Sequence, residues 1–126
     1  MTGDRLILVT GALLAGLGVA LGAFGAHGLR GVLDPAALGW WRTAVDYQMW
    51  HAIGLLAIGA LGHPALRTPA LALAAGTIVF SASLYAMALT GQRWLGAVTP
   101  LGGLLMILGW ALLAWRLSRA SPPELP

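Results

Sequence analysis

The chain has 126 residues, of which 59% are apolar and only 9% carry a charge. A soluble domain carries about a quarter charged residues. The low charge of this chain therefore excludes an ordinary water-exposed surface. The absence of cysteine excludes disulfides and thiolate metal sites. The net charge of +3 comes from arginines that are scattered along the chain, whereas a nucleic-acid-binding face needs them clustered.

Four stretches without charge are each long enough to cross a bilayer, whose ~30 Å hydrocarbon core needs about 20 apolar residues in a helix. We expect spans at about residues 6–28, 47–62, 69–90 and 96–116. The charged residues lie between these stretches or at the chain ends. The sequence therefore predicts an all-α fold, an integral membrane bundle of four transmembrane helices that forms one domain over residues 1–126.

Small residues recur along the first and last stretches. Gly18, Gly22 and Ala26 follow one another at a spacing of four, and Gly102 and Gly103 offer a similar surface on the last stretch. Such rows let helix backbones approach closely in lipid. They predict helix packing within one bundle or, as the alternative, a homo-oligomer interface.

The second stretch is preceded by a segment of mixed polarity. Asp34 and Pro35 are typical of a helix start, because Asp caps the N-terminus and Pro is tolerated at the first position. Residues 36–47 place apolar side chains at helical spacing with polar ones between them. We expect a short amphipathic interfacial segment that leads into the second span. A straight helix through both would be about 40 Å long, so a bend, a tilt or a protruding end is expected.

The remaining helix ends also have recognisable signals. Gly91 is typical of a C-terminal cap, and Thr99 followed by Pro100 predicts a capped helix start. We expect a disordered tail at residues 118–126. Four spans place both termini on one side, and four arginines there against three on the other favour the cytoplasm.

Four blocks of sequence resemble a known family in their order and spacing. They are GAFGAHGL (22–29), TA, YQM and HA within 43–52, SASLY (81–85) and WLGAVTPLGG (94–103). The chain resembles the family called domain of unknown function number 423, which also contains transmembrane protein 256. The resemblance runs from about Arg5 to Trp115 and departs only at Val98, where isoleucine is more usual. It implies a small multi-helix membrane protein, in bacteria at the cytoplasmic membrane, and it implies no particular activity.

Two histidines are candidates for chemistry. His27 closes the first span and His51 lies early in the second, so antiparallel neighbours would bring both near the same membrane face. Two histidines could ligate a metal or relay a proton. A firm zinc site needs three or four ligands, and only Asp46 is a plausible third. We therefore expect each histidine to bond a backbone carbonyl at a helix end, and we predict no metal and no other cofactor.

Other polar residues lie on or beside the second span. Arg42 and Asp46 are four residues apart and share a helix face, which predicts an interfacial salt bridge; Asp46 could instead meet Arg30 or Arg93. The alternative is that Asp46 titrates or binds a substrate at the mouth of a cavity. Tyr47 and His51 have the same spacing and could form a hydrogen bond.

Three hydroxyl groups lie within the third span, on Ser81, Ser83 and Tyr85. Hydroxyls in lipid usually bond the carbonyl one turn back or reach a neighbouring helix. A serine nucleophile needs a base and an orienting acid, and the third span supplies neither. The sequence therefore predicts no catalytic residue.

Three functions remain open. A structural or accessory membrane component, packed in a larger complex or as a homo-oligomer, fits the rows of small residues. A small-molecule or lipid binder or transporter would instead line a polar pocket near one membrane face with His27, Arg42, Asp46, Tyr47, His51 and Tyr85. A metal protein or membrane enzyme would use the two histidines, and separated histidines would exclude it. The lipid bilayer is the partner in every case.

Overall fold

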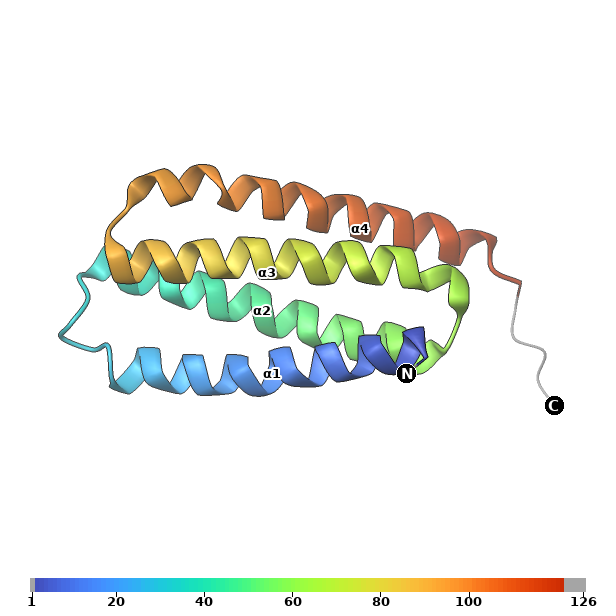
Figure 1. Ribbon diagram of the computed structural model, residues 1–126, viewed down its shortest axis with the longest axis horizontal. Helices are drawn as coiled ribbons and strands as arrows, with labels where there is room; N and C mark the ends of the chain where they lie inside the picture. The colour runs from blue at the N-terminus through green and yellow to red at the C-terminus, as the bar shows by residue number, and fades with distance from the viewer. Residues whose placement is uncertain (1, 122–126) are drawn as a thin grey trace.

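In the computed structural model, which describes residues 2–121, the chain folds into four long helices that run alternately up and down (Figure 1). These are α1 (Gly3–His27), α2 (Pro35–Leu61), α3 (Arg67–Thr90) and α4 (Thr99–Arg119). Two short 3₁₀ helices, η1 (Pro64–Leu66) and η2 (Arg93–Ala97), lie in the connections before α3 and α4. The described residues contain no strand, which confirms the predicted all-α class.

The helix ends follow from local sequence. Asp34 Oδ1 accepts a hydrogen bond of 2.8 Å from the amide of Ala37 and so caps α2 as predicted. Gly62 and Gly91 end α2 and α3 with φ angles of 61° and 70°, a conformation that glycine adopts without strain. The predicted cap at Thr99 is wrong. Thr99 is the first residue of α4, and its hydroxyl lies 2.7 Å from the Ser83 hydroxyl on α3.

Each helix packs mainly against its neighbours in the chain. α1 lies along α2, α2 along α3, and α4 along α3 on the side away from α1 (Figure 1). Leu55, Leu73 and Met106 are buried at the centre of the main core cluster. Large apolar side chains on α1 and α4 face outward, among them Leu13 and Ile107. An outer surface of this kind suits lipid.

Glycines set the closest helix contacts. A Cβ added at Gly102 would lie 2.5 Å from the backbone nitrogen of Phe80 and 2.7 Å from the carbonyl oxygen of Gly76, so α3 and α4 meet backbone to backbone. Among the glycines of α1, those packed most closely against α2 are Gly11, Gly18 and Gly25, at a spacing of seven.

Ala26 and Gly103, two members of the predicted rows, do not make close helix contacts. A Cβ added at Gly22 would lie 3.3 Å from Val45, whereas Ala26 is exposed. A Cβ added at Gly103 would lie 3.8 Å from its nearest neighbour, the Phe80 ring on α3. The close approach of helix backbones therefore occurs inside the bundle. The predicted rows at a spacing of four include only some of the residues that make it.

Three helical segments of the described chain are long and apolar enough to cross a membrane: Gly3–His27, Pro64–Thr90 and Arg93–Arg119. α2 is not among them, because polar residues lie along its length. The predicted interfacial segment, residues 36–47, forms the first half of α2 with no break before the rest. Of the predicted tail, residues 118 and 119 belong to α4, and residues 122–126 lie outside the described part of the chain.

Candidate functional site

Gln48 lies at the point where three helices meet. Its side chain is 3% exposed. The amide nitrogen donates a hydrogen bond of 2.8 Å to the carbonyl oxygen of Leu14 on α1, and the amide oxygen accepts one of 2.7 Å from the Tyr85 hydroxyl on α3. Sequence reasoning did not select Gln48 as a site residue. The signal that could have found it is an uncharged amide in the middle of a long helix, where an unpaired polar group would be costly.

Two further side chains bond the backbone of a neighbouring helix. Trp41 Nε1 donates to the carbonyl oxygen of Leu21 at 2.8 Å, and Ser81 Oγ donates to the carbonyl oxygen of Ala44 at 2.8 Å. The Trp41 ring also packs edge-on against the Tyr85 ring, with 4.6 Å between centroids. With Gln48, these residues form a polar network that joins α1, α2 and α3.

His51 forms a second junction, between α2 and α4. Its Nδ1 lies 2.7 Å from the carbonyl oxygen of Tyr47, and its Nε2 accepts a hydrogen bond of 3.0 Å from Trp110 Nε1. Because a carbonyl oxygen can only accept, Nδ1 must carry the proton, and Nε2 must be bare to accept from the indole. The contacts therefore define the neutral Nδ1–H tautomer, with both ring nitrogens engaged.

The two histidines do not come together. His27 is the last residue of α1 and is exposed, whereas His51 lies sixteen positions after the start of α2, about 24 Å along the helix axis. The prediction that both lie near one membrane face is therefore wrong. The described residues contain no group of three histidine, aspartate or glutamate side chains that could hold a metal ion, and no two-histidine site is formed.

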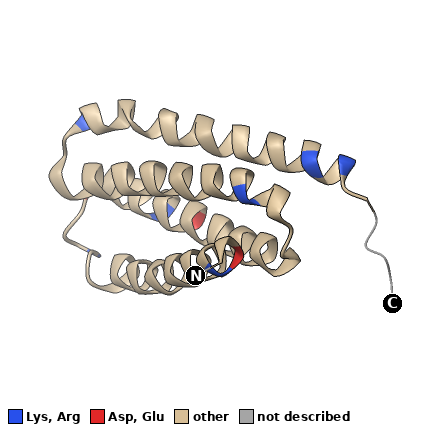
Figure 2. Ribbon diagram, turned by 45° about the vertical axis from the view of Figure 1, so that its right-hand side comes forward, with Lys and Arg blue, Asp and Glu red and all other residues tan. Residues whose placement is uncertain are grey.

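The predicted ion pair of Arg42 with Asp46 is also not formed within residues 2–121. Both side chains are exposed on α2. The ion pair in this part of the chain joins Arg67 to Asp4 through two hydrogen bonds of 3.0 and 3.1 Å, at the ends of α3 and α1. Figure 2 shows that most charged residues gather at the ends of the helices, with charges of both signs also within α2.

The other predicted residues serve packing contacts. Ser83 Oγ donates to the carbonyl oxygen of Phe80 at 2.8 Å, three residues back on its own helix. The Tyr47 ring packs against Phe80 at 4.5 Å and against Trp50 at 5.1 Å between centroids. Neither Ser81 nor Ser83 has a histidine or carboxylate among its hydrogen-bond partners in residues 2–121, so the serines lack the neighbours of a nucleophile.

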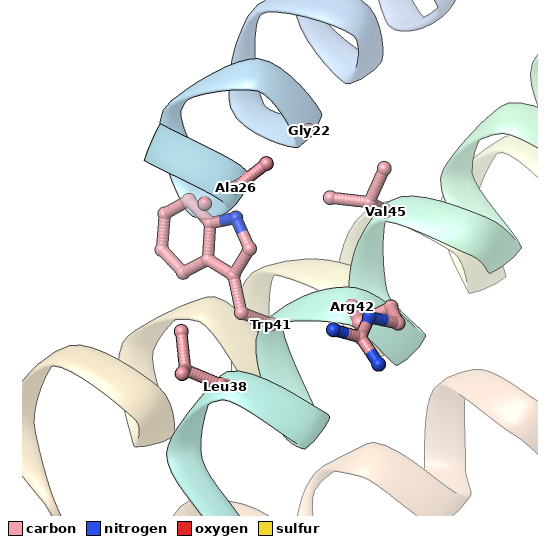
Figure 3. A pocket seen from close by; sticks show the side chains of 7 residues that line it. Gly22, Ala26, Leu38, Trp41, Arg42 and Val45 are labelled. Carbon is pink, nitrogen blue, oxygen red and sulfur yellow. The ribbon is translucent and has the colours of Figure 1, made fainter. Parts of the chain in front are cut away.

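Grooves lie on three parts of the surface. One, of about 230 Å³, runs between α1 and α2. In Figure 3 the Trp41 ring extends toward α1 beneath Ala26, and the Arg42 side chain extends away from α1. A second, of about 190 Å³, lies over Gln48 and Tyr85 between α1 and α3. A third, of about 640 Å³, lies beside η1 and the end of α4. The six side chains predicted to line one polar pocket are not gathered in any of these.

The chain is all-helical, three of its helices are able to cross a bilayer, and buried polar side chains join helix to helix. These features define a small multi-pass membrane protein. Residues 21–103 match the family described as Protein of unknown function (DUF423). The chain belongs to this family.

Relatives extend the match to most of the chain. A UPF0382 membrane protein of Staphylococcus haemolyticus is 45% identical over 112 residues, which cover 86% of this chain and 92% of the relative. The UPF0382 membrane protein YwdK of Bacillus subtilis is 40% identical over 114 residues, covering 86% and 93%. No solved structure matches. The resemblance drawn from the four sequence blocks is confirmed.

Proposed function

We propose that the protein crosses the membrane four times, with α2 as the second span. α2 packs against α1 from Trp41, which contacts Gly25, to Gly59, which contacts Leu8. A helix in contact with a membrane-spanning neighbour over this length must share its depth. The polar residues that lower the hydropathy of α2 include Gln48 and His51, which are buried and paired, so they do not oppose burial in a bilayer.

We propose further that the protein is a structural or accessory component of a bacterial cytoplasmic membrane. Its buried polar side chains are already satisfied: no buried side-chain nitrogen or oxygen of the described residues lacks a hydrogen-bond partner. Gln48, Trp41, Ser81 and His51 each use their polar atoms to join helices. Because these polar groups already bond within the bundle, contact with another molecule falls to the outer faces of the helices.

The observation that carries this proposal is the position of Arg42 and Asp46. Asp46 lies about 17 Å along α2 from Pro35, close to the middle of a helix about 40 Å long. A carboxylate at the bilayer centre costs about 2.5–3.5 kcal/mol on insertion scales. Arg42 can extend toward the headgroups, but the short Asp46 side chain cannot. An exposed charge at this depth is expected where another protein surface, rather than lipid, covers the helix.

The arginine distribution supports a cytoplasmic position for both termini. Arg5, Arg67, Arg116 and Arg119 lie at the end of the bundle where α1 begins and α4 ends (Figure 1), and Arg30 and Arg93 lie at the opposite end. Arg42 lies within α2, so the bias becomes four against two, in the direction that the positive-inside rule associates with the cytoplasm.

Native mass spectrometry of the protein, extracted together with its surrounding lipid, tests the accessory role. A fixed oligomer or a discrete complex with another protein is expected. A monomer that carries only a bound lipid or small molecule would contradict the accessory role and favour a binding protein.

The groove between α1 and α2 is the observation that favours binding as the second candidate. It is lined by Arg42 and by the apolar side chains of Leu38 and Val45 (Figure 3), a combination that suits an anionic headgroup with an apolar chain. If this candidate holds, R42Q will lose the bound lipid in native mass spectra while the bundle keeps its thermal stability.

A further inference from the structure

The outer face of α2 carries a regular seam of exposed residues. They are Gly39, Thr43, Asp46, Trp50, Ile53 and Ala57, named here the α2 seam. Their spacing alternates four, three, four, three and four, which is the 3.5-residue repeat of helices that pack together with a left-handed supercoil. α1 contacts one side of α2 and α3 contacts another, and the seam lies on the face that neither covers.

The seam residues point away from the bundle. Trp50 and Ile53 are each 59% exposed, and a Cβ added at Gly39 would meet nothing within 4 Å. By contrast, Trp41 on the inner side of the same helix is 4% exposed. Small side chains at both ends of the seam, Gly39 and Ala57, leave room for another helix to approach.

The α2 seam contains one charge, Asp46, and Arg42 of opposite charge lies beside it, so the face can complement a second copy of itself. Arg42 and Asp46 carry opposite charges one helical turn apart, about 6 Å along the axis. Within one chain they form no ion pair in the described residues, and the order Arg before Asp is the less favourable one for such a pair. Two copies related by a two-fold axis along the membrane normal would place Arg42 of each within reach of Asp46 of the other.

We infer that the protein forms a parallel homodimer through the α2 seam, held by two reciprocal Arg42–Asp46 ion pairs. This inference rests on the proposed accessory role and names its occupant, a second copy of the chain. A copy brings a cation, its Arg42, to within about one helical turn of Asp46, which lipid cannot supply at this depth. It also covers Trp50 and Ile53, and the two-fold interface closes without leaving a face for further growth.

The native chain has no cysteine, so single cysteines report on contact directly. I53C should form a disulfide-linked dimer in membranes treated with copper-phenanthroline. L13C on α1 and I107C on α4 are matched controls, because these residues are 69% and 66% exposed and lie near the middle of their helices. Cross-linking of the controls as fast as I53C would mean random collision and would overturn the inference.

A charge exchange tests the ion pairs. In the I53C background, D46R should lower the cross-linked fraction at least tenfold, because it places like charges on both sides of the seam. R42D/D46R restores opposite charges and should recover most of the cross-linking. Unchanged cross-linking in D46R would overturn the ion pairs, and the thermal unfolding of each variant identifies a loss caused by misfolding.

The mass of the extracted particle separates failure of the dimer from failure of the accessory role. A particle that contains two copies of this chain supports both the dimer and the accessory role. One copy together with a different protein chain would overturn the dimer and leave the accessory role standing. A monomer without any protein partner would overturn both.

Discussion

The hydroxyl of Tyr85 donates a hydrogen bond of 2.7 Å to the side-chain oxygen of Gln48, and the nitrogen of the same amide donates to the carbonyl oxygen of Leu14. One side chain of α2 thereby links α3 to α1. The carbonyl of Leu14 lies within α1, so this bond needs no break in the helix. The junction lies midway along α1 and α2, where lipid offers no alternative partner.

Removing the Tyr85 hydroxyl should destabilise the bundle. Y85F leaves the buried Gln48 oxygen without a partner, at a cost of about 1–3 kcal/mol. Thermal unfolding in detergent, followed by circular dichroism, measures the change. In the Q48L background, Y85F should have almost no effect, since the partner is already gone.

Y47F is the matched control for this experiment. Tyr47 lies in the same bundle, but its hydroxyl makes no hydrogen bond within the described residues. Its loss should leave the unfolding temperature nearly unchanged. Equal losses in Y47F and Y85F would show that the Tyr85–Gln48 bond contributes nothing specific.

Two adjacent glycines on α4 should respond very differently to alanine. G102A places a Cβ 2.5 Å from the Phe80 backbone nitrogen, so α3 and α4 must move apart, and we expect a loss of about 1–3 kcal/mol. G103A meets nothing closer than 3.8 Å. It should be neutral or slightly stabilising, because alanine favours the helix. Thermal unfolding compares the two, and similar losses would contradict the backbone contact.

The His51 tautomer can be observed directly. Nitrogen-15 chemical shifts should show a protonated Nδ1 and a bare Nε2 at neutral pH, because Tyr47 offers an acceptor and Trp110 a donor. W110F removes the donor and should cost about 0.5–1.5 kcal/mol in unfolding experiments. W115F is the control, since Trp115 is 53% exposed and makes no side-chain hydrogen bond in residues 2–121. An Nε2–H tautomer in the native protein would contradict the Trp110 contact.

Single cysteines at the helix ends test the four-span topology. T2C, H63C and S121C should react with a membrane-impermeant maleimide from one side of the membrane, and G31C and Q92C from the other. This pattern follows because successive long helices run in opposite directions, so the connections between them lie at alternate ends of the bundle (Figure 1). Labelling of G31C from the same side as H63C would show that α2 does not cross.

Composition and periodicity were enough to predict the environment and the class of the fold. Long uncharged stretches have few alternatives to helices in lipid, because every backbone group must be satisfied within the segment. Asp34 and Gly91 marked helix ends correctly because caps depend on the residues immediately around them. The four sequence blocks were likewise enough to identify the family.

Only the tertiary structure decided which polar residues meet. His27 and His51 were expected together because each lies near a predicted span end, but α2 begins at Pro35, and its continuous course carries His51 to Trp110 on α4. Gln48 is the central junction because the orientation of α2 about its own axis points this side chain toward both α1 and α3. The same orientation of α2 points Asp46 outward. Sequence spacing fixes which residues share a helix face, whereas the direction of that face depends on contacts between helices far apart in the chain.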